Sequence, residues 1–510
     1  MQRISRSFRH IGFSTIIVLT GAVSVYAQAP VGRPLTALPT DPAIVSALGQ
    51  VSADRIRATI EKLVSFNNRS TLSSMDTDLK PGTGANAAAD WIASEFGRYA
   101  AECGGCLEVK RDVYTEPGSS AANSRIRKPT KLTNVYAVLR GTDPAQAERR
   151  VLVTGHYDSR NSDNFNTHDA APGANDDASG VAVSLECARV LSKLKFPATI
   201  VFVAVAGEEQ GLNGSKHLAQ LARAEGWQLE AALNNDIVGG DTTPGDTMAD
   251  KTAVRVFSEG VPPSATPEQV RVIERLGAES DSPSRELARA IMDVSASYFR
   301  SGPERAPVAG PGKARSNAIR TLPAFHPVLI FRSDRFLRGG DHTSFNEEGF
   351  TAVRLTEWRE NFDHQHQNVR SENGVEYGDL LKFVDFSYVA NVARLNAAVL
   401  ADLAAAPGAP KNVHVLTQAL DNNTELTWAA AAGAPAGTVY EVLWRSTEEP
   451  VWTTVQTAGS ETHLKLPVSK DNVVFGVRSV DAAGHRSPAV LPQPMARTAA
   501  PVRPAPAAKE

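Results

Sequence analysis

The feature that most restricts the fold is a strand–helix–strand pattern in the first half of the chain. Two apolar, β-branched runs, 150-RVLVTGHYDS-159 and 199-TIVFVAVAGEEQG-211, flank a segment with helical spacing of apolar residues that begins near Ser179. Such runs, without polar alternation, are typical of central strands that are covered on both faces. Two strands joined through a helix lie parallel, so the pattern predicts an α/β domain with a parallel sheet.

The same pattern continues on both sides of this unit. Further strand-like runs occur at 132–141, 231–240, 326–333 and 351–357, and helical patterns occur at 51–66, 86–103, 215–226, 284–300 and 380–405. Pro407 and Pro410 follow the last helix and cannot continue it. We therefore place the α/β domain at residues 51–405.

A second, smaller domain follows, because the apolar period changes to two after residue 410. Short strand-like runs separated by turns extend from 411 to 487, which predicts a small all-β, immunoglobulin-like sandwich at 410–490. Trp428, Tyr440 and the segment 476-GVRSVDAAGHRS-487 resemble a fibronectin type III module. Residues 491–510 are rich in Ala and Pro, and we expect a disordered tail there.

The N-terminus has the pattern of a secretory signal. Three arginines precede the apolar run 11–25, and Val25-Tyr26-Ala27 fits a cleavage site after residue 27. An uncleaved anchor is the alternative. We expect a signal peptide at 1–27, an arm or linker at 28–50, and a periplasmic or secreted protein with no stable membrane insertion after cleavage.

Charge and cysteine content agree with an exported globular protein. The net charge is −3, and −6 without the three arginines of the signal, so nothing indicates a nucleic-acid partner. Cys103 and Cys106 flank two glycines, and in an oxidising compartment we expect a local disulfide between them. Cys187 lies alone in a helical pattern and is predicted to be a small core residue.

Acids and a histidine follow the predicted strands. They are His156, Asp158, Asp176, Asp177, Glu208, Glu209 and Asp236. Each alone is explained by a helix cap, a turn or a solvated helix start. Together they occupy the carboxyl ends of strands, where open α/β sheets bind their ligands. The sequence therefore predicts one polar site at this edge of the sheet.

Several carboxylates in one place repel one another, so we expect a cation among them. Imidazole and carboxylate are typical zinc ligands, and one zinc takes about three of them. Four such residues, His156, Asp176, Glu209 and Asp236, exceed that need, so two metals that share a bridging carboxylate are expected. A second histidine is then required, and 361-NFDHQHQNVR-370 supplies the candidates.

Five motifs occur in order around these residues: GHYDS, PGANDDASG, AGEEQG, LNNDI and GGDHTSF. With them the chain resembles the co-catalytic zinc aminopeptidases of metallopeptidase family twenty-eight, which also includes bacterial leucyl aminopeptidase, aminopeptidase Y and relatives of glutamate carboxypeptidase. The resemblance covers residues 51–403. It implies a three-layer αβα fold with a mixed, mostly parallel central sheet.

The resemblance also implies a role for each site residue. His156 and Asp236 would bind one zinc, Glu209 and a late histidine the other, and Asp176 would bridge the two Zn²⁺ ions. Glu208 would be the general base, and Asp158 would orient His156. The step Gln365-His366 favours His366 as the late ligand, with His364 as the alternative. Asp177 corresponds to a position that follows a strained peptide bond in the family, and Asn175 receives no role.

Two further groups have less definite roles. The pair Asp341-His342 matches a pair in the family and is expected to be structural or to support the ligands. An oxyanion-stabilising residue is not identified, and the candidates in this region are Arg332, Arg335, Arg338 and the more remote Tyr298.

The predicted function is hydrolysis of N-terminal residues from peptides by an exported enzyme with two zinc ions. Three alternatives remain: a carboxypeptidase-like enzyme, a glutaminyl cyclase-like enzyme with one zinc, and an inert enzyme domain whose sandwich binds a partner. The five expected ligands argue against a single zinc. The sequence indicates neither the preferred substrate side chain nor the oligomeric state.

Overall fold

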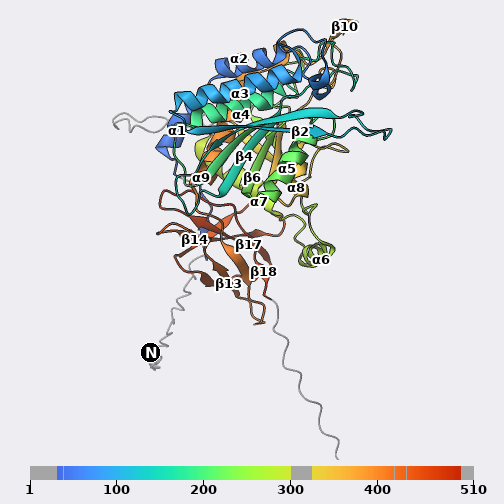
Figure 1. Cartoon of the computed structure of the whole chain (residues 1–510). Coiled ribbons are helices and arrows are strands. Elements are labelled where there is room, and N and C mark those ends of the chain that lie inside the picture. The colour runs from blue at the N-terminus through green and yellow to red at the C-terminus, as the bar shows by residue number, and fades with distance from the viewer. Residues whose placement is uncertain (1–30, 38, 300–323, 419, 432, 496–510) are drawn as a thin grey trace, which may run out of the picture.

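The central element of the structure is an eight-stranded mixed sheet, seen in a computed structural model of the chain (Figure 1). The structure describes residues 31–37, 39–299, 324–418, 420–431 and 433–495. The predicted signal peptide and residues 496–510 of the predicted tail lie outside the described residues.

The order of the strands places four parallel strands at the centre of the sheet. In spatial order the strands are β2 (Leu107–Glu116), β3 (Thr130–Leu139), β5 (Thr199–Val205), β4 (Arg149–His156), β6 (Gln228–Asn235), β9 (Ala352–Glu357), β7 (Ala253–Phe257) and β8 (His326–Ile330). β5, β4, β6 and β9 are mutually parallel, while β3 and β7 join their outer edges antiparallel. The predicted mixed, mostly parallel sheet is confirmed.

Both faces of the sheet are buried, which explains why its central strands lack polar alternation. In β5, Ile200 and Phe202 pack into one core, and Val201 and Val203 pack into the core on the opposite face. Helices cover each face, as Figure 1 shows for α2, α3 and α4 above the sheet and α5 and α8 below it. This is the three-layer αβα arrangement that the sequence predicted.

The two helical layers are unequal. The larger layer contains α1 (Pro42–Leu48), α2 (Ala53–Val64), α3 (Gly84–Glu102), α4 (Ala178–Leu191), α7 (Pro283–Tyr298) and α9 (Phe386–Ala405). The smaller layer contains α5 (Asn213–Ala224) and α8 (Asp341–Glu347), and α6 (Pro267–Leu276) carries no buried residue. Within the described residues, no helix is long and apolar enough to cross a membrane.

The strands end earlier than their apolar runs suggest. β4, β5 and β6 stop at His156, Val205 and Asn235, before the polar residues that complete each motif. After β5 the chain turns at Gly207, whose φ of +70° favours glycine. β2, β7, α6 and α8 are not evident from the sequence pattern, because they are short or lie at the margin of the domain. Two short 3-10 turns (Thr71–Met75, Leu381–Phe383) and a hairpin (β10, Arg370–Glu372; β11, Val375–Tyr377) complete this part.

The C-terminal part contains two four-stranded sheets around a common core. One consists of β1 (Arg33–Pro34), β15 (Thr454–Gly459), β14 (Val439–Ser446) and β17 (Val473–Val480), and the other of β16 (His463–Leu466), β13 (Thr424–Ala429), β12 (Lys411–Val415) and β18 (Gln493–Pro494). Trp428, Tyr440 and Phe475 lie in the core. The expected arm contributes β1 to this part and α1 to the α/β part.

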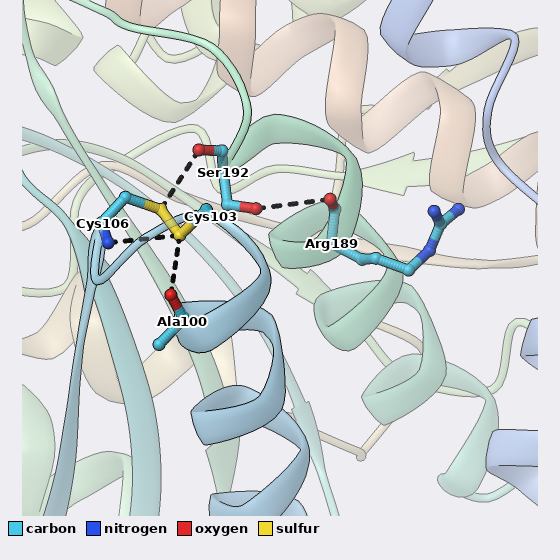
Figure 2. Close-up of a disulfide and its surroundings, with 5 residues drawn as sticks. All are labelled: Ala100, Cys103, Cys106, Arg189 and Ser192. Carbon is cyan, nitrogen blue, oxygen red and sulfur yellow. Dashed lines mark hydrogen bonds between the residues drawn. A yellow bond between two sulfur atoms is a disulfide. The ribbon is translucent and has the colours of Figure 1, made fainter.

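Cys103 and Cys106 form the expected disulfide, which links the end of α3 to the start of β2 (Figure 2). Their Cα atoms are 5.6 Å apart, and the Sγ atom of Cys106 lies 3.1 Å from the carbonyl oxygen of Ser192. Cys187 is a free, fully buried thiol in α4, as predicted.

Candidate metal centre

The predicted site residues converge at the carboxyl edge of the four parallel strands. His156 is the last residue of β4, and Asp236 directly follows β6. Glu208 and Glu209 lie in the turn between β5 and α5, and Asp176 lies in the loop before α4. Because these strands run in the same direction, residues distant in sequence meet at one edge.

One group consists of His156, Asp176 and Asp236. His156 Nε2 is 3.1 Å from Asp176 Oδ1 and 3.9 Å from Asp236 Oδ1. All three side chains are buried. One ligand atom from each lies within 4.8 Å of the others, a spacing that could hold a single metal ion.

A second group consists of Asp176, Glu209 and His366. His366 Nε2 is 2.8 Å from Asp176 Oδ2 and 3.1 Å from Glu209 Oε1. Asp176 thus directs one carboxylate oxygen to each group, as a bridging ligand does. His364 lies elsewhere, since its ring stacks on Phe383 and its Nδ1 contacts Asp241. Of the two histidines considered, the structure brings only His366 to the cluster.

Hydrogen bonds of its own polar side chains fix the loop before α4. The Asp176–Asp177 peptide bond is cis. Asp177 caps α4 by accepting the N–H of Gly180 at 2.9 Å, and it also accepts the N–H of His156 at 3.0 Å. Asn175 donates to Glu357 at 3.1 Å. Asn175 also accepts the N–H of Gly239, so the side chains of Asn175 and Asp177 both fix the backbone here, which leaves Asp176 to face the cluster.

Asp158 lies beside His156, as expected, and contacts its ring mainly through the backbone. The carbonyl oxygen of Asp158, at 3.1 Å, is the hydrogen-bond partner of His156 Nδ1, whereas the nearer carboxylate oxygen is 3.6 Å away. The carboxylate instead accepts the N–H groups of Glu208 at 3.2 Å and Glu209 at 3.1 Å. Asp158 therefore positions the strand end that carries both glutamates.

The cluster has a strongly negative field. Burial acts to lower the pKa of His366, but Glu209 and Asp176 more than offset it and raise the pKa to about 10. Burial, with Asp236 and Glu209 nearby, raises the pKa of Glu208 well above its usual value. These shifts show that the site favours added positive charge.

A pocket of about 670 Å³ opens beside this cluster. Glu208 and His366 line it, together with arginine and glutamine side chains and the apolar Leu212, Leu337 and Phe362. Glu208 is the half-buried member of the glutamate pair, and Glu209 is buried. The two neighbouring acids thus differ in access to the pocket.

Comparison with known proteins agrees with this geometry. The model of Peptidase family M28 matches residues 134–279. A probable zinc metalloprotease of Pyrenophora teres f. teres is 44% identical over 467 residues, covering 91% of this chain and 89% of the relative. One of Pyricularia oryzae is 44% identical over 473 residues, covering 92% and 88%. The chain belongs to Peptidase family M28.

Among solved structures, the LapA aminopeptidase of Legionella pneumophila is a distant match to this M28 chain. The two are 19% identical with a TM-score of 0.45, over 73% of this chain and 77% of LapA.

The residues of this M28 peptidase fit zinc. Imidazole nitrogen and carboxylate oxygen are the donors that zinc takes in hydrolytic sites. Glu209 Oε1 is buried and, within the described residues, accepts no hydrogen bond, although it lies beside His366 Nε2. A buried carboxylate oxygen without a donor is costly unless a cation binds it. The donor set therefore suits the metal that the relatives' names give.

Several supporting residues of the M28 site were not predicted. Arg354 lies 3.0 Å from Asp236, Arg160 lies 2.9 Å from Glu209, and Gln365 donates to Asp176 at 2.9 Å. Asp379 accepts the N–H of Asp176 at 2.7 Å. The sequence could have pointed to Arg354, because it is a charged residue within the apolar run 351-TAVRLTE-357, but no comparable feature marks Asp379.

The four candidates for stabilising the oxyanion lie in different parts of the structure. Tyr298 is buried in α7, where its hydroxyl accepts the N–H of Asp41. Arg335 pairs with Asp334 and Glu360, and Arg332 stacks over Phe336. Of these four, the structure places only Arg338 on the pocket beside Glu208.

The Asp341-His342 pair is buried at the start of α8. His342 Nε2 lies 2.8 Å from the carbonyl oxygen of Ser333, and burial raises the pKa of Asp341 to about 7. Neither residue belongs to the two metal-binding groups.

Proposed function

We propose that this M28 metallopeptidase is an exported aminopeptidase that binds two zinc ions. The observation that supports the proposal most is the pair of ligand groups sharing Asp176 beside a pocket that Glu208 lines. His156 and Asp236 would hold one ion, Glu209 and His366 the other. When bound, zinc lowers the pKa of water and polarises the scissile carbonyl.

Glu208 is the residue that moves the proton. It accepts a proton from the attacking water and passes it to the leaving amine. Glu208 lines the pocket and belongs to neither ligand group, which leaves its carboxylate free to take this proton. Asp158 holds the backbone N–H groups of Glu208 and Glu209 and so fixes the position of both side chains.

The acid cluster supports action at the N-terminus. A free α-amino group is cationic near neutral pH, and the carboxylates of this edge attract such a charge. The N-terminal signal pattern and the Cys103–Cys106 disulfide support export, because disulfides persist in oxidising compartments.

The test combines metal content per chain with hydrolysis of matched peptides that carry free or acetylated N-termini. Two zinc ions and cleavage of the free peptides alone are expected. Cleavage of acetylated peptides from the C-terminus would identify a carboxypeptidase. One zinc with cyclisation of N-terminal glutamine would identify a glutaminyl cyclase, and absence of turnover in the zinc-loaded protein would contradict enzymatic function.

A further inference from the structure

Three arginines line the pocket beside Glu208. They are Arg125, Arg160 and Arg338, and Glu208 is the one acid among its described lining residues. A pocket that only had to receive a cationic peptide terminus would not need three guanidinium groups. An arginine in this pocket that is not paired with an acid of the protein would therefore indicate a negative group elsewhere on the substrate.

Two of these arginines are already paired with acids. Arg160 Nε is 2.9 Å from Glu209 Oε2, so this carboxylate matches the charge of Arg160. Arg338 Nη1 is 3.2 Å from Glu360, an acid that also binds two other arginines. Neither guanidinium presents an unmatched charge to the pocket.

Arg125 differs from both. It lies in the connection between β2 and β3, and its side chain is partly buried. Its Nη1 donates at 2.6 Å to the backbone carbonyl of Glu209, and within the described part of the chain no carboxylate pairs with it. One hydrogen bond uses one of the five N–H donors of a guanidinium. The remaining donors and the full charge stay available beside Glu208.

We propose that Arg125 is a specificity residue that binds a carboxylate of the peptide close to the scissile bond. The carbonyl of Glu209 anchors one edge of the guanidinium, which prepares the other donors for a carboxylate. Two sources offer this chemistry: the C-terminal carboxylate of a dipeptide and an acidic side chain next to the cleaved bond. This inference rests on the proposed peptidase function.

The experiment compares kcat/KM for three peptides that share the same free N-terminal leucine. They are Leu-Leu amide, Leu-Leu with a free carboxylate, and Leu-Glu amide. The wild type is expected to favour at least one carboxylate peptide over the neutral amide. Arg125→Gln is expected to reduce that preference about 10- to 100-fold, the range for hydrogen bonds to charged groups. Arg125→Lys, which keeps the charge, should restore part of it.

A neighbouring arginine is the matched control. Arg127 lies two residues away in the same connection, is exposed, and stacks over Phe165. Arg127→Gln should leave the preference unchanged. Loss of preference for Leu-Leu alone would identify the terminal carboxylate, and loss for Leu-Glu amide alone would identify the side chain.

Two outcomes would overturn the inference and are distinguishable. If the wild type hydrolyses the peptides but Arg125→Gln slows all three equally, Arg125 has a structural role only. If the zinc-loaded wild type hydrolyses none, the proposed function itself fails, and the assignment of Arg125 fails with it.

Discussion

At the residue scale, the neighbours Glu208 and Glu209 differ in surroundings, because Glu208 lines the pocket and Glu209 is buried, and the proposed mechanism gives them separate tasks. Glu208→Gln keeps the shape of the side chain but cannot accept a proton. We expect kcat to fall about 10²- to 10⁴-fold, the usual contribution of general base catalysis. Zinc content should remain unchanged, because Glu208 belongs to neither ligand group. Loss of zinc from this variant would show that Glu208 is a ligand.

The two late histidines give a matched pair of variants. His366→Ala removes a ligand atom that lies beside Asp176 and Glu209, so we expect about one zinc per chain in place of the two proposed for the wild type. His364→Ala removes only a contact with Asp241 and a stack on Phe383, and should retain both ions. Metal analysis of the dialysed proteins measures this difference, and the reverse result would make His364 the ligand.

The sequence could indicate His156, Glu208, Glu209 and Asp236 because each ends or closely follows a strand whose direction is fixed. Asp176 and His366 lie in longer loops and were suggested by the family motifs instead. The sequence could not predict contacts made by distant loops. It also could not predict whether a residue makes its contact through the backbone or through the side chain. Asp158 is the clearest case, since its carbonyl contacts His156 while its carboxylate holds two backbone N–H groups. The sequence pattern gave no indication of Arg125. It lies in the connection between β2 and β3, far in the sequence from the other pocket residues, and only the fold brings it to the pocket.

At the element scale, helix α7 joins the α/β part to the sandwich through buried polar contacts. Trp452 Nε1 donates at 2.9 Å to Glu286 Oε2, and Arg289 contacts the same glutamate. Trp452→Phe would leave a buried oxygen without its donor, which costs about 1–3 kcal/mol of unfolding free energy. Urea unfolding of both proteins would measure it. An unchanged midpoint would mean that this bond contributes nothing to the joint.

The strands likewise divide into those that their own sequence indicates and those that form only through tertiary contacts. β4 and β5 were predictable because burial on both faces imposes long apolar runs, and β6 and β9 were predictable from shorter ones. β1 was not, because two residues of an expected linker become a strand only through pairing with β15.

At the scale of the whole molecule, α9 connects the α/β part to the sandwich and carries the buried acid Asp402. This acid faces His485 and Arg486, and burial raises its pKa from 3.8 to about 7. Between these values the folded chain binds a proton that the unfolded chain releases. Its contribution to stability is therefore complete below about pH 4 and is lost as the pH rises through 7.

Asp402→Asn removes this titration while keeping the size of the side chain. The wild type should therefore lose more stability than the variant between pH 5 and pH 8, by an amount on the order of 1–4 kcal/mol, since one pKa unit corresponds to about 1.4 kcal/mol. Urea unfolding of both proteins at the two pH values measures this difference, and any constant effect of the amide cancels in the comparison. Equal pH dependence in the two proteins would show that Asp402 stays ionised in the fold, and that His485 and Arg486 across the joint outweigh its burial.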